Sequence, residues 1–129
     1  MGVFRVRIEV GDAPWERYEA LEALVDTGAT NTLLLASLLA ALGVKPYRKS
    51  TFELADGTQL ELDVGRTWVR VDGQQEFTQV VFGKEGAEPI LGAVTLEEMG
   101  LAVDPIARRL VPVHKYLCSC SLAATLTLA

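Results

Sequence analysis

The stretch of the sequence with the clearest chemical potential is VDTGAT at residues 25–30, which has apolar residues on both sides. A carboxylate is almost never fully buried unless it is paired or hydrogen-bonded, so Asp26 needs a partner or a polar cleft. Gly28 permits a tight turn, and its N–H and that of Ala29 are able to point back at the carboxylate. The Thr27 hydroxyl can donate and accept a hydrogen bond at once. The stretch therefore predicts a polar site in which the Asp26 carboxylate is held by its own turn.

Other charged residues have simpler structural explanations. Three aspartates lie in patterns that are typical of turns, namely Asp56, Asp72 and Asp104. The adjacent Arg108 and Arg109 are expected to form surface or dimer ion pairs rather than to clamp a substrate. None of these residues competes with the 25–30 stretch as a catalytic candidate.

The run HKYLCSC contains the residues that could suggest a metal site. His114, Cys118 and Cys120 supply three candidate ligands, but the run lacks the paired C-x-x-C spacing of structural zinc sites. The two cysteines are also too close in sequence to cross-link distant elements. We therefore expect reduced thiols and no metal.

Composition restricts the class of protein. A chain of 129 residues is long enough for one domain with one core. The formal net charge is -5 and the Lys and Arg residues are scattered, so no basic stripe exists for a nucleic acid. No apolar run reaches the ~20 residues that span a bilayer, and the N-terminal residues alternate as in a strand rather than a signal peptide. We expect a cytoplasmic protein that binds neither nucleic acid nor membrane.

Period-two alternation of apolar residues predicts several strands. After a first strand at the N-terminus, GDAP at 11–14 indicates a turn. Residues 15–25 contain Glu and Ala that also suit a helix, but their alternation and the glycine turn that follows favour a strand. Two hairpins are predicted at 52–62 and 67–82, because an Asp-Gly pair lies at the centre of each.

Two short segments predict helices. Residues 33–43 are rich in Leu and Ala, lack β-branched residues and end in glycine. Residues 95–100 begin with Thr95 as a cap and carry Glu98 three residues later, the pattern of a capping box. The remaining elements are expected to be a polar loop at 83–88, a short strand at 89–92 and a hairpin at 101–113. Many short strands with two brief helices favour a closed, mainly antiparallel β architecture.

The DTGA motif, flanked by apolar residues, resembles the active-site motif of the aspartic proteases. Pepsin-like enzymes carry two such motifs in two lobes, whereas retropepsins build one site from two identical chains. With one copy, this sequence resembles the retropepsins, and in particular the small bacterial retropepsin-like proteases. The order of two hairpins, an ILG strand (90–92) and a short helix agrees with this. The resemblance covers residues 3–113 and implies a mainly β fold, a retropepsin-like closed antiparallel β-barrel with two short helices and one lobe per chain.

The function implied by this resemblance is that of an aspartic endopeptidase that works as a homodimer. Two Asp26 carboxylates would share one proton and activate a water against a peptide carbonyl, without a metal or other cofactor. Thr27 would brace the two loops across the dimer, Gly28 would complete the catalytic motif, and the 52–62 hairpin would close over an extended peptide or protein substrate. The resemblance further implies substrate-binding roles for Ala29, Thr30, Ala55, Asp56, Gly57, Ile90 and Leu91.

Two alternatives use the same fold without catalysis, because a fold does not determine a function. One is a catalytically silent dimeric module that binds peptides, and the other is a structural oligomerisation domain. The tail at 114–129 lies outside the resemblance, and its last residues carry no charged side chain. A free apolar tail is unfavourable, so we expect it to pack at the dimer interface, as a strand or as a helix.

Overall fold

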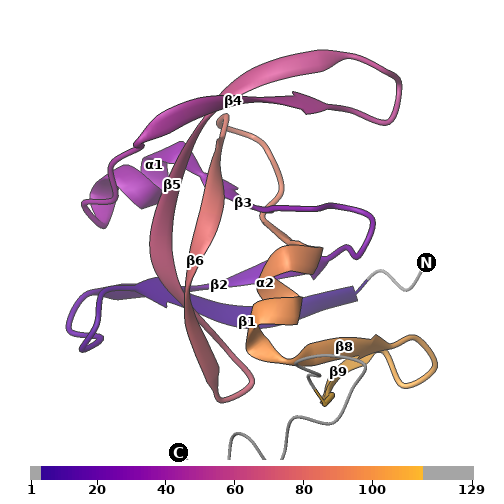
Figure 1. The fold of residues 1–129 in the computed structure, drawn as a ribbon. Coiled ribbons are helices and arrows are strands. Elements are labelled where there is room, and N and C mark those ends of the chain that lie inside the picture. Colours follow the sequence, from indigo (N-terminus) through magenta and orange to yellow (C-terminus); the bar gives the residue numbers. More distant parts are fainter. Residues whose placement is uncertain (1–3, 115–129) are drawn as a thin grey trace, which may run out of the picture.

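The structure is a computed structural model that describes residues 4–114. It consists of β-strands with two short helices (Figure 1). In chain order the elements are β1 (Phe4–Gly11), β2 (Tyr18–Val25), β3 (Thr32–Leu35), α1 (Ala36–Ala41), β4 (Arg48–Glu53), β5 (Gln59–Val71), β6 (Gln74–Gly83), β7 (Ile90–Leu91), α2 (Ala93–Met99), β8 (Leu101–Asp104) and β9 (Arg109–Pro112). The predicted mainly β fold with two short helices is confirmed. None of the helices in this part of the chain is long and apolar enough to cross a membrane.

The main sheet is ring-like. Its strands follow the order β1-β2-β7-β3-β6-β5-β4, and β1 also pairs with β5, so the pairing returns to its starting strand. Its pairings are mainly antiparallel, as expected, but β2 pairs with β7 and β3 pairs with β6 in parallel. Parallel neighbours need long connections rather than hairpins. Here β7 pairs with β2 and β6 pairs with β3, although several elements separate the two strands of each pair in the sequence. The small β8-β9 sheet is separate from the ring.

Both predicted central hairpins are present, and they share one long strand. β5 pairs with β4 along its first half and with β6 along its second half. The turn residues Gly57, Asp72 and Gly73 have φ values of 86°, 51° and 82°, in the left-handed region that Gly and Asp tolerate best. The Asp-Gly pairs therefore fix the positions of both tips.

The two predicted helices begin at other residues in the structure than the sequence indicated. The expected helix at 33–43 is wrong in its first part, because Thr32–Leu35 forms β3 and α1 begins only at Ala36. Pairing of β3 with β6 and burial of Leu34 outweigh the helical preference of leucine. The expected cap at Thr95 is also wrong, since α2 begins after Gly92. Gly100 ends α2 in the left-handed conformation, as predicted.

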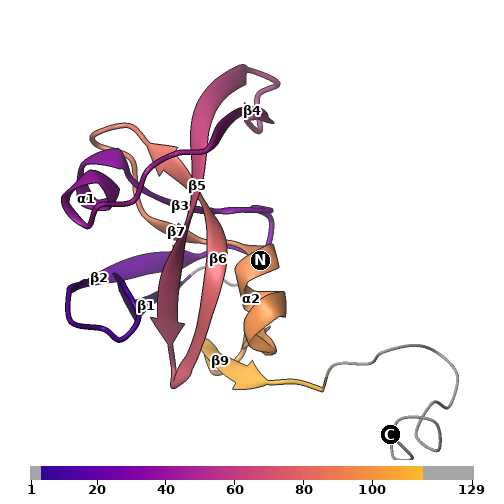
Figure 2. The same cartoon turned by 60° about the vertical axis from the view of Figure 1, so that its left-hand side comes forward.

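The hydrophobic core lies inside the ring and continues under α2. Leu34, Leu91 and Val80 are fully buried where β3, β7 and β6 meet. Leu96 and Met99 of α2 join the same cluster. In two views related by a rotation, α2 lies against β6 (Figures 1 and 2). Only Gly92 separates the end of β7 from the start of α2, and the candidate site begins at this junction.

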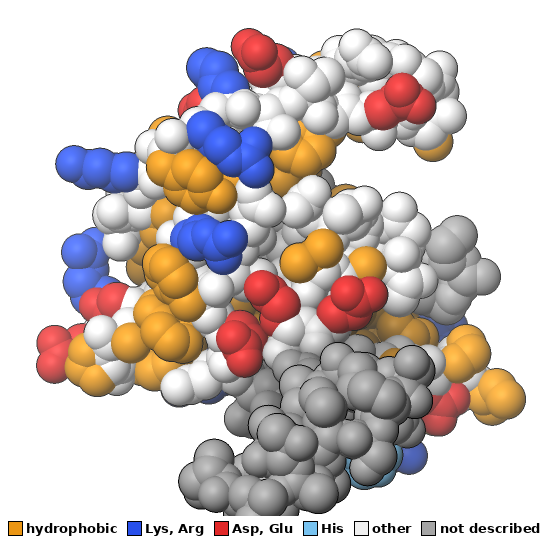
Figure 3. Space-filling model, in the orientation of Figure 1, with side chains coloured by type: hydrophobic (Ala, Val, Ile, Leu, Met, Phe, Trp, Pro, Cys, Tyr) orange, Lys and Arg blue, Asp and Glu red, His pale blue; other side chains and the backbone are white. Residues whose placement is uncertain are grey.

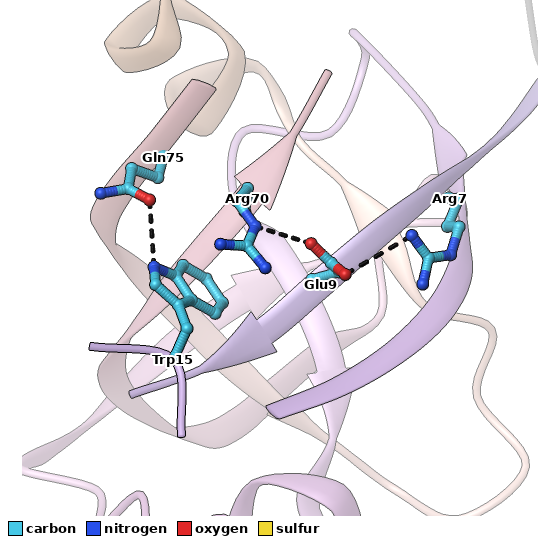
Figure 4. A network of polar contacts seen from close by, with 5 residues as sticks. All are labelled: Arg7, Glu9, Trp15, Arg70 and Gln75. Atoms are coloured by element: carbon cyan, nitrogen blue, oxygen red, sulfur yellow. Dashed lines mark hydrogen bonds and ion pairs between the residues drawn. The ribbon is translucent and has the colours of Figure 1, made fainter. Parts of the chain in front are cut away.

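A network of side chains stabilises the closure of the ring between β1 and β5 (Figure 4). Glu9 and Arg70 are paired in register, and Arg70 Nε donates to Glu9 Oε1 over 2.6 Å. The Arg70 guanidinium lies 4.1 Å from the centre of the Trp15 ring, and Trp15 Nε1 donates to Gln75 over 3.0 Å. Arg7 lies 3.4 Å from the other Glu9 oxygen. The hydrogen bond from Arg70, supported by both cations, lowers the pKa of Glu9.

Candidate active site

The loop at 26–31 joins β2 to β3 and holds the Asp26 carboxyl in place. Asp26 Oδ1 accepts a hydrogen bond of 2.9 Å from the N–H of Gly28, as the sequence predicts. The N–H of Ala29 instead donates to the backbone carbonyl of Asp26 over 3.1 Å, so it does not hold the carboxylate. The Asp26 N–H donates to the carbonyl of Leu91 over 3.2 Å. Asp26 is half-buried, so its carboxyl is fixed by the loop and still reachable from solvent.

The first turn of α2 is bound to the same loop through the backbone. The N–H groups of Ala93 and Val94 donate to the carbonyls of Ala29 and Thr30 over 2.8 and 3.0 Å. The first N–H groups of a helix have no partner within the helix, so they need acceptors from elsewhere. The loop supplies those acceptors and is held in place by them.

Gly92 lets the loop pass directly against the junction of β7 and α2. A Cβ atom at Gly92 would lie 2.4 Å from the carbonyl carbon of Asn31 and 2.5 Å from its oxygen. Any larger residue would therefore push the loop away from β7. The Gly92 N–H donates to the Thr32 hydroxyl over 3.1 Å, which links the glycine to the start of β3.

A buried hydroxyl network lies beneath the loop. The Thr32 and Thr95 hydroxyl oxygens are 2.6 Å apart, and the Thr95 and Thr78 hydroxyl oxygens are 3.0 Å apart. The Thr78 hydroxyl donates to Glu98 Oε1 over 2.6 Å. All three threonines are nearly inaccessible, with exposed fractions of 0%, 1% and 1% for Thr32, Thr78 and Thr95. The network joins β3, β6 and α2 under the Asp26 loop, and nothing in the local sequence marks Thr32 or Thr78 for it.

Three apolar side chains form a row beside the loop. Ile90 pairs with Leu24 on one side and with Leu33 on the other, so the three residues share one face of the sheet. All three are only half-buried. Leu91, in contrast, is fully buried and meets the Asp26 loop through its backbone carbonyl, so its role in substrate binding stays a prediction. The row of Leu24, Leu33 and Ile90 is called the apolar floor below.

The tip of the β4–β5 hairpin, residues 54–58, is exposed and internally ordered. The N–H of Leu54 donates to the carbonyl of Thr58 over 2.8 Å, and the N–H of Thr58 donates to Asp56 Oδ1 over 2.9 Å. The latter bond lowers the pKa of Asp56. Ala55, Asp56 and Gly57 all face solvent. Asp56 therefore has a structural role in shaping the tip.

The hairpin projects over the side of the molecule that carries the Asp26 loop. In both ribbon views the tip and the loop that joins β2 to β3 extend to the same side (Figures 1 and 2). The space-filling view shows an open hollow between the projecting arm and the body (Figure 3). A chain of polar contacts links the loop to the base of the hairpin, because Asn31 donates to Gln79 over 3.3 Å and Gln79 donates to the Tyr47 hydroxyl over 3.4 Å.

The candidate site thus consists of a held carboxyl, the apolar floor and the exposed hairpin tip. A family model described as aspartyl protease matches residues 6–95, which include the Asp26 loop, the hairpin, β7 and the start of α2. The chain therefore belongs to this aspartyl protease family, and the predicted resemblance to retropepsin-like aspartic proteases is confirmed. A comparison with curated proteins found no match.

Proposed function

We propose that the protein is an aspartic endopeptidase that acts as a homodimer. The observation that carries this proposal is the fixed Asp26 loop, whose carboxyl accepts the Gly28 N–H and whose backbone is bound to β7 and α2. The sequence contains one DTGA motif, so one chain supplies one of the two carboxylates that the chemistry uses. In this proposal the ring-like sheet is the closed barrel of a single retropepsin-like lobe.

The mechanism follows from bringing two Asp26 carboxyls together across a two-fold axis. Two like charges in contact cannot both ionise easily, so the pair shares one proton. The ionised carboxylate takes a proton from a water molecule, which attacks the peptide carbonyl. The protonated carboxyl stabilises the developing oxyanion, and a proton then passes to the leaving amine. Thr27, which is exposed at the loop apex, is proposed to brace the partner loop.

The substrate is proposed to be an extended peptide between the apolar floor and the hairpin tip. β4 is the last strand in the sheet order, so one of its edges has no strand partner within residues 4–114. A peptide can add to such an edge through main-chain hydrogen bonds, while side-chain pockets give selectivity. The half-buried Leu24, Leu33 and Ile90 favour an apolar side chain next to the cleaved bond. Ala29, Thr30 and the tip residues 55–57 are proposed to complete the peptide contacts.

The decisive experiment is cleavage of a mixed peptide library by purified protein, with two matched variants. Asp26→Asn retains the shape of the side chain but cannot exchange the proton, so we expect it to fold and associate normally without cleaving. Asp72→Asn is the control, since it makes the same change at the β5–β6 turn, where φ is 51° and Asn is well tolerated. Wild-type turnover by Asp26→Asn would show that Asp26 is not the catalytic residue.

Peptide binding and cleavage by the same purified proteins also distinguish a peptidase from the two non-catalytic alternatives. A wild-type protein that binds the peptides without cleaving them would be a catalytically silent peptide-binding module. A protein that associates but binds no peptide would be a structural oligomerisation domain. Sedimentation tests the oligomeric state directly, and we expect an isologous dimer. A stable monomer with full peptidase activity would contradict the shared site.

A further inference from the structure

We propose that the protein has a second binding site, for a small organic anion, in a hollow bounded by β1, the β5–β6 turn and the β8–β9 hairpin. The hollow has a volume of about 450 Å³, within the ~300–1,000 Å³ that is usual for ligand pockets. Its lining includes no residue of the Asp26 loop, the apolar floor or the hairpin tip. The site is therefore distinct from the candidate active site and does not depend on peptidase activity.

The charge of the hollow is opposite to that of the chain. The chain has a formal net charge of -5, whereas the hollow is lined by Arg7, Arg108 and Arg109 against the single carboxylate of Asp72. Three arginines line this one concavity, from β1, from the β8–β9 turn and from the start of β9, and together they attract an anion. Guanidinium also matches carboxylate and phosphate groups through paired hydrogen bonds.

The turn that carries two of these arginines is ordered by its own hydrogen bonds. Asp104 Oδ1 accepts the N–H groups of Ile106 and Ala107, both over 3.1 Å. The N–H of Arg108 donates to the carbonyl of Asp104 over 2.9 Å, and Arg108 adopts a φ of 56°. Arg109 follows in β9, paired with Asp104. The positions of the arginine backbones are thus fixed before a ligand arrives, which reduces the entropic cost of binding.

The three arginines differ in the interactions that they already make within the chain. Arg7 lies 3.4 Å from Glu9, but 66% of its side chain is exposed, so this pair is weak. Glu9 keeps its shorter contact with Arg70 if Arg7 turns to a ligand. Arg108 has an interaction of its own within the chain. Arg7 and Arg109 are accordingly the two residues that are proposed to hold the anion.

The rest of the lining indicates an organic ligand rather than a bare ion. Val6 supplies the accessible apolar part of the wall, while Val71 and Leu110 are 2% and 8% exposed and contribute little surface. An apolar wall favours a carbon skeleton, and the arginines favour its carboxylate or phosphate group. The ligand class is therefore a small molecule with one or more such groups.

The test is calorimetric titration of the full chain with citrate and, separately, with inorganic phosphate, both at constant ionic strength. We expect one ion per chain to bind, with amide chemical shifts that change around Arg7 and Arg109. Binding of citrate alone identifies a carboxylate ligand, and binding of phosphate alone identifies a phosphorylated one. If neither ion binds, or if the shift changes lie elsewhere, the proposal is wrong.

A pair of matched double variants separates a site from general attraction. Arg7→Gln/Arg109→Gln should weaken binding by at least about tenfold, because it removes two charge-assisted contacts. Arg48→Gln/Arg66→Gln removes the same charge outside the hollow and should leave the affinity unchanged. Equal weakening by both variants would show a non-specific charge effect and overturn the proposal. The shift mapping on the unaltered protein gives an independent answer if a variant folds poorly.

Discussion

Replacement of Thr95 by valine tests whether the buried hydroxyl network holds the candidate site. Thr95 is 1% exposed, and its hydroxyl lies 2.6 Å from that of Thr32 and 3.0 Å from that of Thr78. Valine has nearly the same shape and a similar helix propensity, so the change removes two hydrogen bonds without opening a cavity. At about 1 kcal/mol for each net hydrogen bond, the free energy of unfolding should fall by at least about 2 kcal/mol.

The directions of the hydrogen bonds around Thr95 raise the loss above this value. Thr32 still accepts the Gly92 N–H over 3.1 Å, and Thr78 still donates to Glu98 over 2.6 Å. Because the Thr78 proton goes to Glu98, the Thr95 hydroxyl donates to Thr78 and accepts from Thr32. The variant therefore leaves the buried Thr32 O–H without its acceptor, which adds about 1–3 kcal/mol.

The assay is urea unfolding followed by circular dichroism at one fixed chain concentration, because association would make stability depend on concentration. Thr67→Val is the matched control. Thr67 is also buried, at 3% exposed, but its hydroxyl makes only a long bond of 3.4 Å to the carbonyl of Gly11. Its loss should be below about 0.5 kcal/mol. If Thr95→Val is no more destabilising than Thr67→Val, the network does not stabilise the site.

Three further predictions concern other parts of the chain. Gly92→Ala should destabilise by about 2–3 kcal/mol in urea, because its Cβ would lie 2.4 Å from Asn31, and unchanged stability would show that the loop moves freely. The pKa of Glu9 is lowered by Arg70, so its contribution to stability is present above the unfolded value of ~4.3 and disappears as pH falls through the folded value. The stability gap between wild type and Glu9→Gln should therefore shrink between neutral pH and about pH 3, and a constant gap would contradict this. Deletion of residues 114–129, of which 115–129 lie outside the described part of the chain, should weaken dimerisation or solubility, as measured by sedimentation. Unchanged association and solubility would mean that the tail has no such role.

Features that depend on nearby residues could be predicted from the sequence. The two Asp-Gly tips were predictable because a positive φ at Gly57 and Gly73 is a local requirement that few residues meet. The hydrogen bond from Gly28 to Asp26 was predictable because both atoms belong to one turn. β3 was not predictable, because its leucines acquire strand structure only by pairing with β6.

The misassigned cap at Thr95 shows how the loop and α2 depend on one another. The sequence of Thr95 and Glu98 matches a capping box, yet neither side chain caps the helix. The cap is unnecessary because Ala29 and Thr30 of the Asp26 loop offer their carbonyls to the first N–H groups of α2. The Thr95 hydroxyl is thereby available to the buried network instead.

Because the Asp26 loop caps α2, the candidate site and the helix depend on the same contacts. A helix of seven residues is too short to be stable alone, so α2 depends on tertiary contacts. The carbonyls of Ala29 and Thr30 provide such contacts at its start, and the Thr32 hydroxyl provides another through Thr95. A loop that caps a helix at one end and follows a paired strand at the other has little freedom to move. The Asp26 carboxyl is therefore positioned by the backbone of its own loop, as the proposed shared site requires.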